Sequence, residues 1–321
     1  MKKLLTVLII TTLLVLTGCS NNQQEEVAET KYKIGIVQLV KHAALDAATR
    51  GFIDEVYKQL GEDNVEIIEE NASGDSSNCS LIVNGFIQDE VDLIMANATP
   101  ALQAAYSATS DIPILGTSVT EYGVALGIDN FSGVSGSNVS GTSDLAPLED
   151  QAQMILDLLP ETKTVGILYC SSEANSIYQV KVVKDYLESK GIKVEEATFN
   201  DSNDIAIVTQ DLCNLVDAIY IPTDNMAAAC AETIGGVTIP ANTPVITGDE
   251  GTCVGAGIAT LAISYYELGV ETGKMAVEVL TGKADISSMK IRYYENPIKE
   301  YNQTICEQLN ITVPDDYVAV D

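Results

Sequence analysis

Short apolar runs alternate with longer amphipathic segments along most of this 321-residue chain. Runs such as 33–37 (KIGIV) and 91–95 (VDLIM) are short and rich in Ile, Leu and Val, which predicts buried strands. Segments 44–60 and 177–190 place apolar residues at helical spacing, and the second ends before Gly191, a typical helix stop. This alternation indicates an α/β fold whose parallel sheets are covered by helices on both faces.

The pattern occurs twice. Three pieces of the first half recur in the second, in the same order and at nearly the same spacing: KIGIV (33–37) and TVGIL (164–168), VDLIM (91–95) and VDAIY (217–221), DIPILGTSV (111–119) and NTPVITGDE (242–250). The repetition predicts two doubly wound parallel-sheet lobes joined by a hinge. Ligands of open parallel sheets bind beyond the carboxyl ends of the strands. We therefore expect the turns after these strands to face each other across one cleft.

Lobe boundaries follow from this repeat. We expect the first lobe to comprise residues 31–138 plus about 258–286, and the second to comprise 139–257 plus about 287–321. The Gly/Ser-rich segment 133–144 is the predicted first crossing between the lobes, with a plain surface loop as the alternative. A helix at 264–280 is expected to return to the first lobe, and an extended stretch at 289–294 to be the final crossing strand.

The first 30 residues have a different character. Lys2 and Lys3 precede an apolar run at 4–16, which is too short for a comfortable membrane span and is typical of a secretory signal. The segment ending at Cys19 (LTGC) resembles the lipobox of bacterial lipoproteins, and an ordinary secretion signal is the alternative. We interpret residues 1–18 as a signal peptide and 19–30 as a flexible tether. The expected location is the extracytoplasmic face of the cell membrane, with a lipid on Cys19.

Charge and cysteine content exclude several functions. The chain has 46 acidic and 17 basic residues, a net charge of −29, so it would repel nucleic acids. Six further cysteines lack metal-ligand spacing, and His42 is the lone histidine, so no metal or cofactor is expected. We expect mostly buried thiols, with one disulfide as an open alternative.

The strand-end turns carry side chains that suit a zwitterionic ligand. Asp224 could pair with an ammonium group or could equally be the N-cap of the next helix, and Glu173 and Glu250 are second choices. Because Lys41 is the only cation nearby, a ligand carboxylate would be held by helix N-termini and hydroxyl groups. The candidate ligand-binding residues are Gln38, Asn97, Thr99, Ser118, Thr142, Glu173, Asn175, Asp224, Asn225 and Glu250.

Several segments together resemble a known family: IGIVQLVKHAALDAATRGF, NASGD, DLIMANATPALQAA, NVSGTSD, LYCSSEANS, YIPTDN, GDEG and YYELG. They are similar to the type I periplasmic binding fold, and more narrowly to substrate-binding lipoproteins of ABC transporters of the tryptophan/tyrosine type. The resemblance spans about 31–313. It implies a monomer that captures a small molecule, such as an aromatic amino acid, by hinge closure and delivers it to a permease with its ATPase. Departures at Cys170 and Asp249 leave the ligand's identity open.

Two other functions stay as alternatives. A sensory or adhesion lipoprotein would need the same capture and closure without transport. An enzyme using the same cleft is less favoured, because the chain has no GxSxG, HExxH or P-loop pattern.

Overall fold

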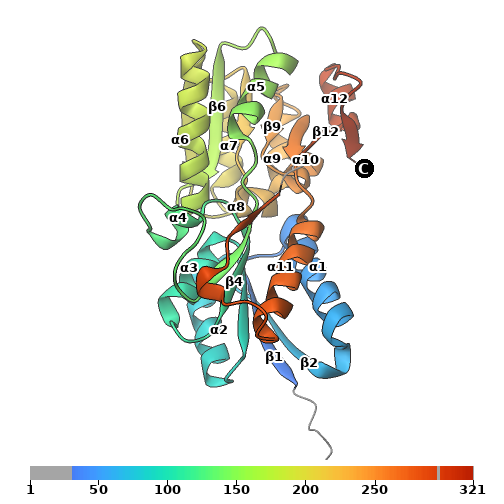
Figure 1. Cartoon of the computed structure of the whole chain (residues 1–321). Coiled ribbons are helices and arrows are strands. Elements are labelled where there is room, and N and C mark those ends of the chain that lie inside the picture. The colour runs from blue at the N-terminus through green and yellow to red at the C-terminus, as the bar shows by residue number, and fades with distance from the viewer. Residues whose placement is uncertain (1–30, 295–296, 321) are drawn as a thin grey trace, which may run out of the picture. The chain divides into compact units, whose positions relative to one another are not determined.

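The structure is a computed structural model that describes residues 31–294 and 297–320 (Figure 1). The predicted signal peptide, Cys19 and the predicted tether lie outside the described residues. None of the described helices is long and apolar enough to cross a membrane. The six cysteines of the described part are all thiols, four of them buried and two partly exposed.

The first lobe is built on a sheet in the order β11-β5-β4-β3-β1-β2, with all neighbouring strands parallel. Its strands are β1 (Tyr32–Gln38), β2 (Val65–Asn71), β3 (Leu93–Asn97), β4 (Ile114–Val119), β5 (Val139–Ser143) and β11 (Arg292–Tyr293). Its helices are α1 (Ala43–Leu60), α2 (Ser76–Gln88), α3 (Thr99–Ala108), α4 (Tyr122–Leu126) and α11 (Tyr265–Leu280), with 3-10 turns at Glu62–Asn64 and Ile286–Ser288. Alternate residues of a strand point to opposite faces, so α1 and α11 cover one face and α2 and α3 the other.

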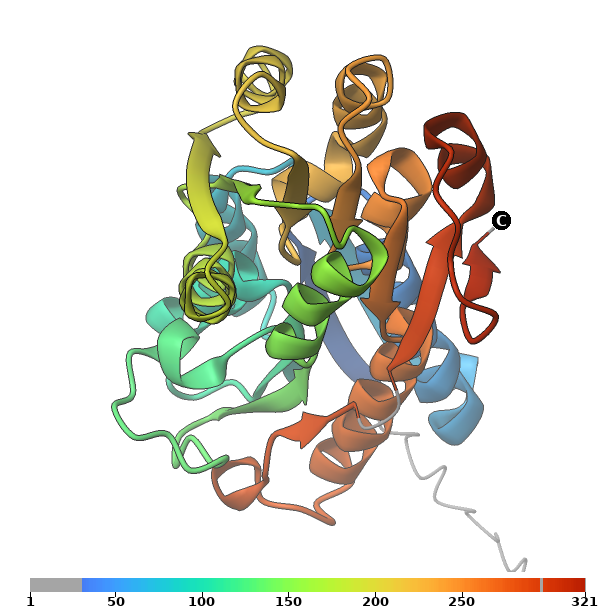
Figure 2. The same ribbon diagram turned by 90° about the horizontal axis from the view of Figure 1, so that it is seen from above.

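The second lobe is built on a sheet in the order β13-β12-β10-β9-β8-β6-β7, in which β10 and β12 are antiparallel and the other pairs parallel. Its strands are β6 (Thr164–Cys170), β7 (Lys193–Phe199), β8 (Ala218–Ile221), β9 (Val245–Thr247), β10 (Ala259–Ala262), β12 (Ile298–Asn302) and β13 (Val318–Val320). Its helices are α5 (Leu148–Leu158), α6 (Ala174–Ser189), α7 (Ile205–Cys213), α8 (Asn225–Ala229), α9 (Ala231–Thr238), α10 (Glu250–Ala256) and α12 (Gln303–Leu309). Figure 2 shows α5 and α6 on one side of these strands and α7 and α9 on the other. The predicted fold class, two doubly wound lobes, is confirmed.

The lobe boundaries differ from the predicted ones. β5 pairs with β4 in the first sheet, so the first crossing lies at 144–147 instead of 133–144. β10 pairs with β9 and β12, which places 259–262 in the second lobe and the second crossing at 263–264. β11 pairs with β5, so residues up to 293 stay in the first lobe. These strands are short and two of them are rich in small residues, so the apolar pattern does not mark them.

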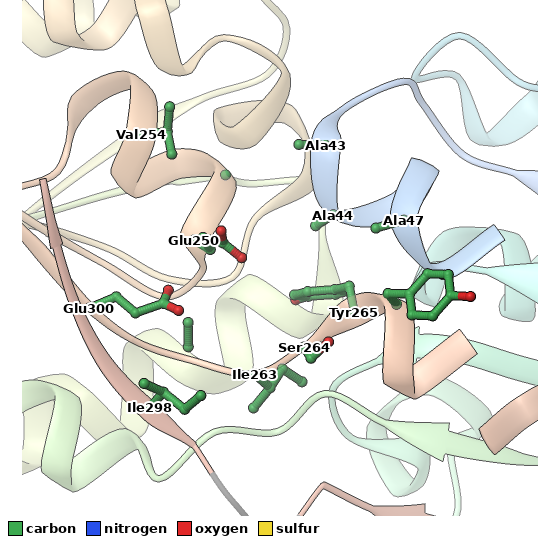
Figure 3. Close-up of a pocket in the computed structure, with 13 residues that line it drawn as sticks. Ala43, Ala44, Ala47, Glu250, Val254, Ile263, Ser264, Tyr265, Ile298 and Glu300 are labelled. Atoms are coloured by element: carbon green, nitrogen blue, oxygen red, sulfur yellow. The ribbon is translucent and has the colours of Figure 1, made fainter. Parts of the chain in front are cut away.

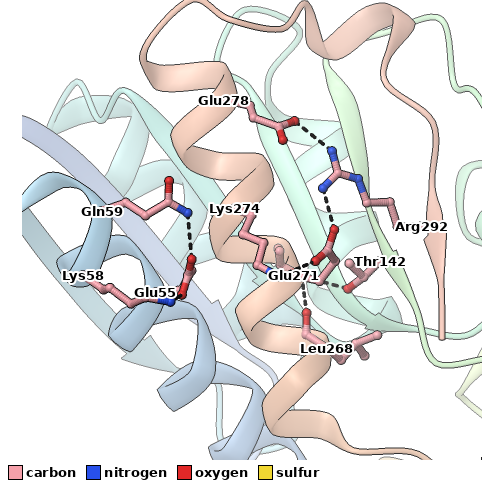
Figure 4. Close-up of polar contacts among 10 residues, drawn as sticks. Glu55, Lys58, Gln59, Thr142, Leu268, Glu271, Lys274, Glu278 and Arg292 are labelled. Atoms are coloured by element: carbon pink, nitrogen blue, oxygen red, sulfur yellow. Dashed lines mark hydrogen bonds and ion pairs between the residues drawn. The ribbon is translucent and has the colours of Figure 1, made fainter. Parts of the chain in front are cut away.

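The returning helix α11 is tied to the first lobe by polar contacts as well as by its apolar face. Arg292 of β11 donates hydrogen bonds to Glu271 and Glu278 at 2.6 and 2.8 Å (Figure 4). Below them the hydroxyls of Thr142 and Thr272 lie 2.8 Å apart. The ion pairs are about one-third exposed, so they stabilise the helix only modestly. The close fit of α11 against α1 matters more.

That fit depends on glycines. A Cβ atom at Gly269 would lie 2.0 Å from the carbonyl oxygen of Ala48 in α1, and one at Gly51 would lie 2.1 Å from the carbonyl oxygen of Tyr266. The two helix backbones therefore pack directly on each other. This contact fixes where α11 begins, and Tyr265 at its start reaches the space between the lobes.

We expect Gly269→Ala to lower the free energy of unfolding by about 1–3 kcal/mol, because the added methyl group forces the two helices apart. Gly85→Ala is the matched control. It lies inside α2 with no atom within 4 Å of the added Cβ, so it should stabilise the protein by about 0.5–1 kcal/mol through helix propensity. Urea unfolding of both variants measures the difference. Equal stability of Gly269→Ala and the wild type would contradict this account of the packing.

Candidate functional site

A narrow cavity lies between the lobes, at the carboxyl ends of strands from both sheets. Its lining residues are His42, Leu45, Ser118, Thr120, Asp144 and Tyr265 from the first lobe and its crossing, and Asn175, Thr223, Asp224, Asn225, Ala228 and Asp249 from the second. The centre of a water molecule can move in only about 10 Å³ of it, enough for about one water. The turns after β4, β6, β8 and β9 thus face each other, as predicted. In this closed arrangement there is no room for an amino acid without some movement.

Buried polar atoms without hydrogen-bond partners gather in the cavity wall. They are Ser118 Oγ, Asp144 Oδ1, Asn175 Oδ1 and His42 Nδ1 within the described chain. Ser118, Asp144 and Asn175 are each at most 5% exposed. Because most buried polar groups in proteins are hydrogen-bonded, four unpaired ones around one cavity indicate a site for a polar ligand.

Asp144 is one of the cavity residues that the sequence reasoning missed. It follows β5 directly, where the first crossing begins, and its Oδ2 accepts a hydrogen bond from the hydroxyl of Tyr265 at 3.0 Å. Burial raises the pKa of Asp144 to about 6. At neutral pH the side chain is therefore a carboxylate with one oxygen unpaired and no cation beside it. Such a group favours a positively charged ligand.

Asp224 also lines the cavity, but both of its oxygens are already in use. Oδ1 accepts from Ala227 N at 2.8 Å, and Oδ2 accepts from Cys170 N and Ser176 Oγ at 2.7 Å each. Of the two roles expected for Asp224, the helix N-cap is thus the one present in the structure. Burial raises its pKa. This carboxylate contributes negative charge to the cavity, but it has little remaining capacity to bind a ligand directly.

Asp249 is the third carboxylate of the cavity. Its two oxygens accept from Thr252 N at 2.8 Å and Thr252 Oγ1 at 2.6 Å, which caps α10. No lysine or arginine of the described chain is among the lining residues. The cavity therefore has a strongly negative potential, which suits a cationic group on the ligand.

Glu173 lies behind the cavity and orients two amides that line it. It accepts hydrogen bonds from the Nδ2 atoms of Asn175 and Asn225, and also from the backbone N of Asn225 and Met226. With both Nδ2 atoms held this way, the Oδ1 atoms of the two amides remain as acceptors: that of Asn225 lies next to His42, and that of Asn175 has no partner. Burial and the neighbouring Asp224 raise the pKa of Glu173. Glu173 was expected to contact the ligand, and its geometry is that of a positioning residue.

His42 connects the lobes across the cavity. Its Nε2 lies 3.4 Å from Asn225 Oδ1 of the second lobe. Glu173 accepts from Asn225 Nδ2 and so fixes the amide, which leaves Asn225 Oδ1 to accept the hydrogen bond from His42. His42 Nε2 therefore carries the proton, and Nδ1 is an acceptor. Burial lowers the pKa of His42, which keeps the ring neutral. His42 stands at the N-cap position of α1 without capping it.

The other candidate residues lie outside the cavity lining. Gln38 donates to Asp46 Oδ1 and accepts from Thr49 Oγ1, both at 2.6 Å, which ties β1 to α1. Asn97 donates to the carbonyl oxygen of Leu45 at 2.9 Å, and its Oδ1 has no partner. Thr99 begins α3 with a buried, unpaired hydroxyl.

Two further candidates lie elsewhere. Thr142 is covered by α11 and bonded to Thr117 and Thr272 inside the first lobe. Glu250 lines a separate pocket next to the hinge. Of the predicted ligand-binding residues, Ser118, Asn175, Asp224 and Asn225 line the cavity between the lobes.

Comparison with known proteins shows the family of this chain. The model for ABC transporter substrate binding proteins matches residues 33–320. The chain belongs to this family. A tyrosine-binding protein of Clostridioides difficile (strain R20291) is 36% identical over 297 residues, which cover 88% of this chain and 85% of that protein.

Two solved structures have similar sequence identity to this chain but differ in how well they superpose on it. An ABC domain from Streptococcus pneumonia in complex with L-Trp is 32% identical, with a TM-score of 0.86 over 91% of this chain and 100% of that one. The ligand-free, open structure of CD0873 from Clostridium difficile is 35% identical, with a TM-score of 0.68 over 90% of this chain and 100% of that one. At nearly equal identity, this structure thus superposes better on the L-Trp complex than on the ligand-free, open structure.

We expect Asp144→Asn to stabilise the ligand-free protein at pH 7.5. Raising the pKa of a buried aspartate to about 6 corresponds to a cost on the order of 3 kcal/mol for its charged form, and a neutral amide avoids most of that cost. The gain should disappear below about pH 4, where Asp144 is protonated in both the folded and the unfolded chain.

Asp224→Asn is the contrasting variant. An amide has one acceptor oxygen in place of two, so this change should lower the free energy of unfolding by about 1–3 kcal/mol through lost hydrogen bonds. Urea unfolding at pH 7.5 and pH 4 tests both expectations. A destabilised Asp144→Asn protein at pH 7.5 would show that its carboxylate is needed for folding.

Proposed function

We propose that this family member is the extracytoplasmic receptor of an ABC importer and that it captures an aromatic α-amino acid between its lobes. Lipid attachment at Cys19 would hold it at the membrane. The observation that carries the proposal is the group of unpaired buried acceptors, drawn from both lobes, around a cavity lined by carboxylates and no lysine or arginine of the described chain.

The ligand's ammonium group would bind these acceptors. The ammonium group has three N–H donors. Three unpaired acceptors are available to them: Asp144 Oδ1, Asn175 Oδ1 and Nδ1 of the neutral His42. Asp144 supplies the compensating charge, and Glu173 keeps the Asn175 amide in the accepting orientation. A ligand held from both lobes stabilises the closed state by its differential affinity for that state.

The ligand's carboxylate would be held by neutral donors. Ser118 Oγ is the unpaired hydroxyl in the cavity, and Ser118 itself has a φ of 54° in the left-handed region. Such strained backbone in non-glycine residues is concentrated at binding sites. The ring of Tyr265, with Leu45 and Ala228, offers an apolar wall for an aromatic side chain.

A small cavity fits this proposal only if the lobes open to admit the ligand. The crossings at 144–147 and 263–264 are single chain segments, which suits hinge rotation. The relatives support the ligand class, since one is named for tyrosine binding and another holds L-Trp.

Isothermal titration calorimetry with L-tyrosine and L-tryptophan tests the ligand class. We expect at least one of them to bind, and Asp144→Asn to weaken that binding by about 1.5–3 kcal/mol, roughly 10- to 150-fold, because a charge-assisted bond is lost. Asp129→Asn, which removes the same charge from an exposed position, is the control and should bind as the wild type does. Full affinity in Asp144→Asn would rule out the proposed role of this carboxylate.

Affinity should also depend on pH. Below about pH 6 Asp144 must lose its proton before an ammonium group can pair with it, so affinity should fall by up to tenfold per pH unit. Protonation of His42 would oppose binding in the same direction, but at lower pH because its pKa is lowered. Titrations at pH 5, 6, 7 and 8 measure this slope, which Asp144→Asn should flatten. Constant affinity from pH 8 to pH 5 in the wild type would contradict the assignment.

A further inference from the structure

A second, much larger pocket lies on the hinge side of the molecule (Figure 3). The centre of a water molecule can move in about 550 Å³ of it, against about 10 Å³ in the cavity between the strand ends. This volume is in the range of small-molecule sites, about 300–1,000 Å³. Tyr265 is the one residue that lines both spaces among the described residues, so its ring forms part of the wall between them.

The walls of this hinge pocket are mainly apolar and come from both lobes. Its lining residues are Ala43, Ala44 and Ala47 of α1; Glu250, Gly251 and Val254 of α10; Ala262, Ile263, Ser264, Tyr265 and Tyr266 around the second crossing; and Ile298 and Glu300 of β12. In Figure 3 the α1 alanines stand across the pocket from Glu250 and Val254 of α10. The alanines leave room for a ligand's apolar body.

Two carboxylates lie together on one side. Glu250 and Glu300 extend toward the same space, and Glu300 Oε2 is a buried atom without a hydrogen-bond partner (Figure 3). Burial and the negative charge of Glu250 raise the pKa of Glu300 to about 7. No lysine or arginine of the described chain lines the pocket. Glu300 therefore has unmet capacity for a cation, and the exposed Glu250 adds negative charge beside it.

A hydroxyl on the same sheet face adds a second, independent observation. Thr260 is fully buried, and its Oγ1 has no hydrogen-bond partner. It pairs with Glu300 across β10 and β12, just as Ala262 pairs with Ile298, so these four side chains share one sheet face. Ala262, Ile298 and Glu300 line the pocket, so Thr260 belongs to the sheet face that borders the pocket, although it is not itself a lining residue.

We propose that the hinge pocket is a second binding site, for an organic ammonium ion with an apolar body and no carboxylate. The ammonium group would lie between Glu250 and Glu300, and the apolar body would lie against the α1 alanines, Ile263 and Val254. A ligand carboxylate placed beside Glu250 and Glu300 would be repelled, so the ligand proposed for this pocket carries none. The chemical class of this ligand therefore differs from that proposed for the cavity between the strand ends.

2-Phenylethylamine is a suitable probe, and 3-phenylpropionate is its matched anionic counterpart. Calorimetry with the full chain, in the absence of any amino acid, should show binding of the amine and none of the acid. Glu300→Gln should weaken amine binding at least tenfold. Ala43→Trp, an exposed position on the pocket wall, should abolish it by filling the space. Thermal unfolding of each variant verifies that it is folded, and Ala43→Trp decides the matter if Glu300→Gln does not fold.

Asp144→Asn distinguishes the two sites. It should leave amine binding unchanged, whether or not the protein binds tyrosine or tryptophan. Loss of amine binding in Asp144→Asn with retention in Ala43→Trp would place the amine in the cavity between the strand ends and overturn the proposal. Absence of amine binding at millimolar concentration, or equal binding of the acid, would also overturn it.

Discussion

A buried carboxylate is costly unless a cation or several donors meet it, and this constraint organises the region between the lobes. Asp224 and Asp249 meet donors at the N-termini of α8 and α10, and their hydrogen bonds cap those helices. Asp144 does so only in part, through the hydroxyls of Thr120 and Tyr265. The carboxylates differ in function because they differ in how many donors surround them. Binding energy is available where the protein has left a charge incompletely paired.

Orientation of the neutral partners depends on a group that does not line the cavity. Glu173 holds the amides of Asn175 and Asn225, and through Asn225 it determines which nitrogen of His42 carries the proton. One buried side chain thus sets the accepting direction of three groups. Glu173, whose pKa is raised, therefore acts on the site by orienting its neighbours and does not itself line the cavity.

Much of the fold could be predicted from the sequence because the β-branched strands and their repetition are strong signals. The facing turns followed from parallel topology, and Ser118, Asn175, Asp224 and Asn225 were found in this way. Asp144 was missed because β5 (VSGTS) lacks large apolar residues and reads as a loop. Thr142 was wrongly placed near the ligand site for the same reason: the sequence does not say that α11 covers it. Local sequence also cannot distinguish an acid that caps a helix from one that binds a ligand, since both follow a strand and precede a helix.

The order of the two lobes' strands and helices along the sequence has a consequence for folding during synthesis. The first sheet needs β11, and α11 covers it, yet both follow nearly the whole second lobe in the sequence. The second sheet in turn receives β12 and β13 from the last residues of the chain. Neither sheet can be completed during synthesis until residues 292–320, which carry β11, β12 and β13, have been made, and a chain cut at 144–147 would leave two fragments with exposed sheet edges. A polypeptide of this interleaved kind reaches its final fold only after both lobes have been synthesised.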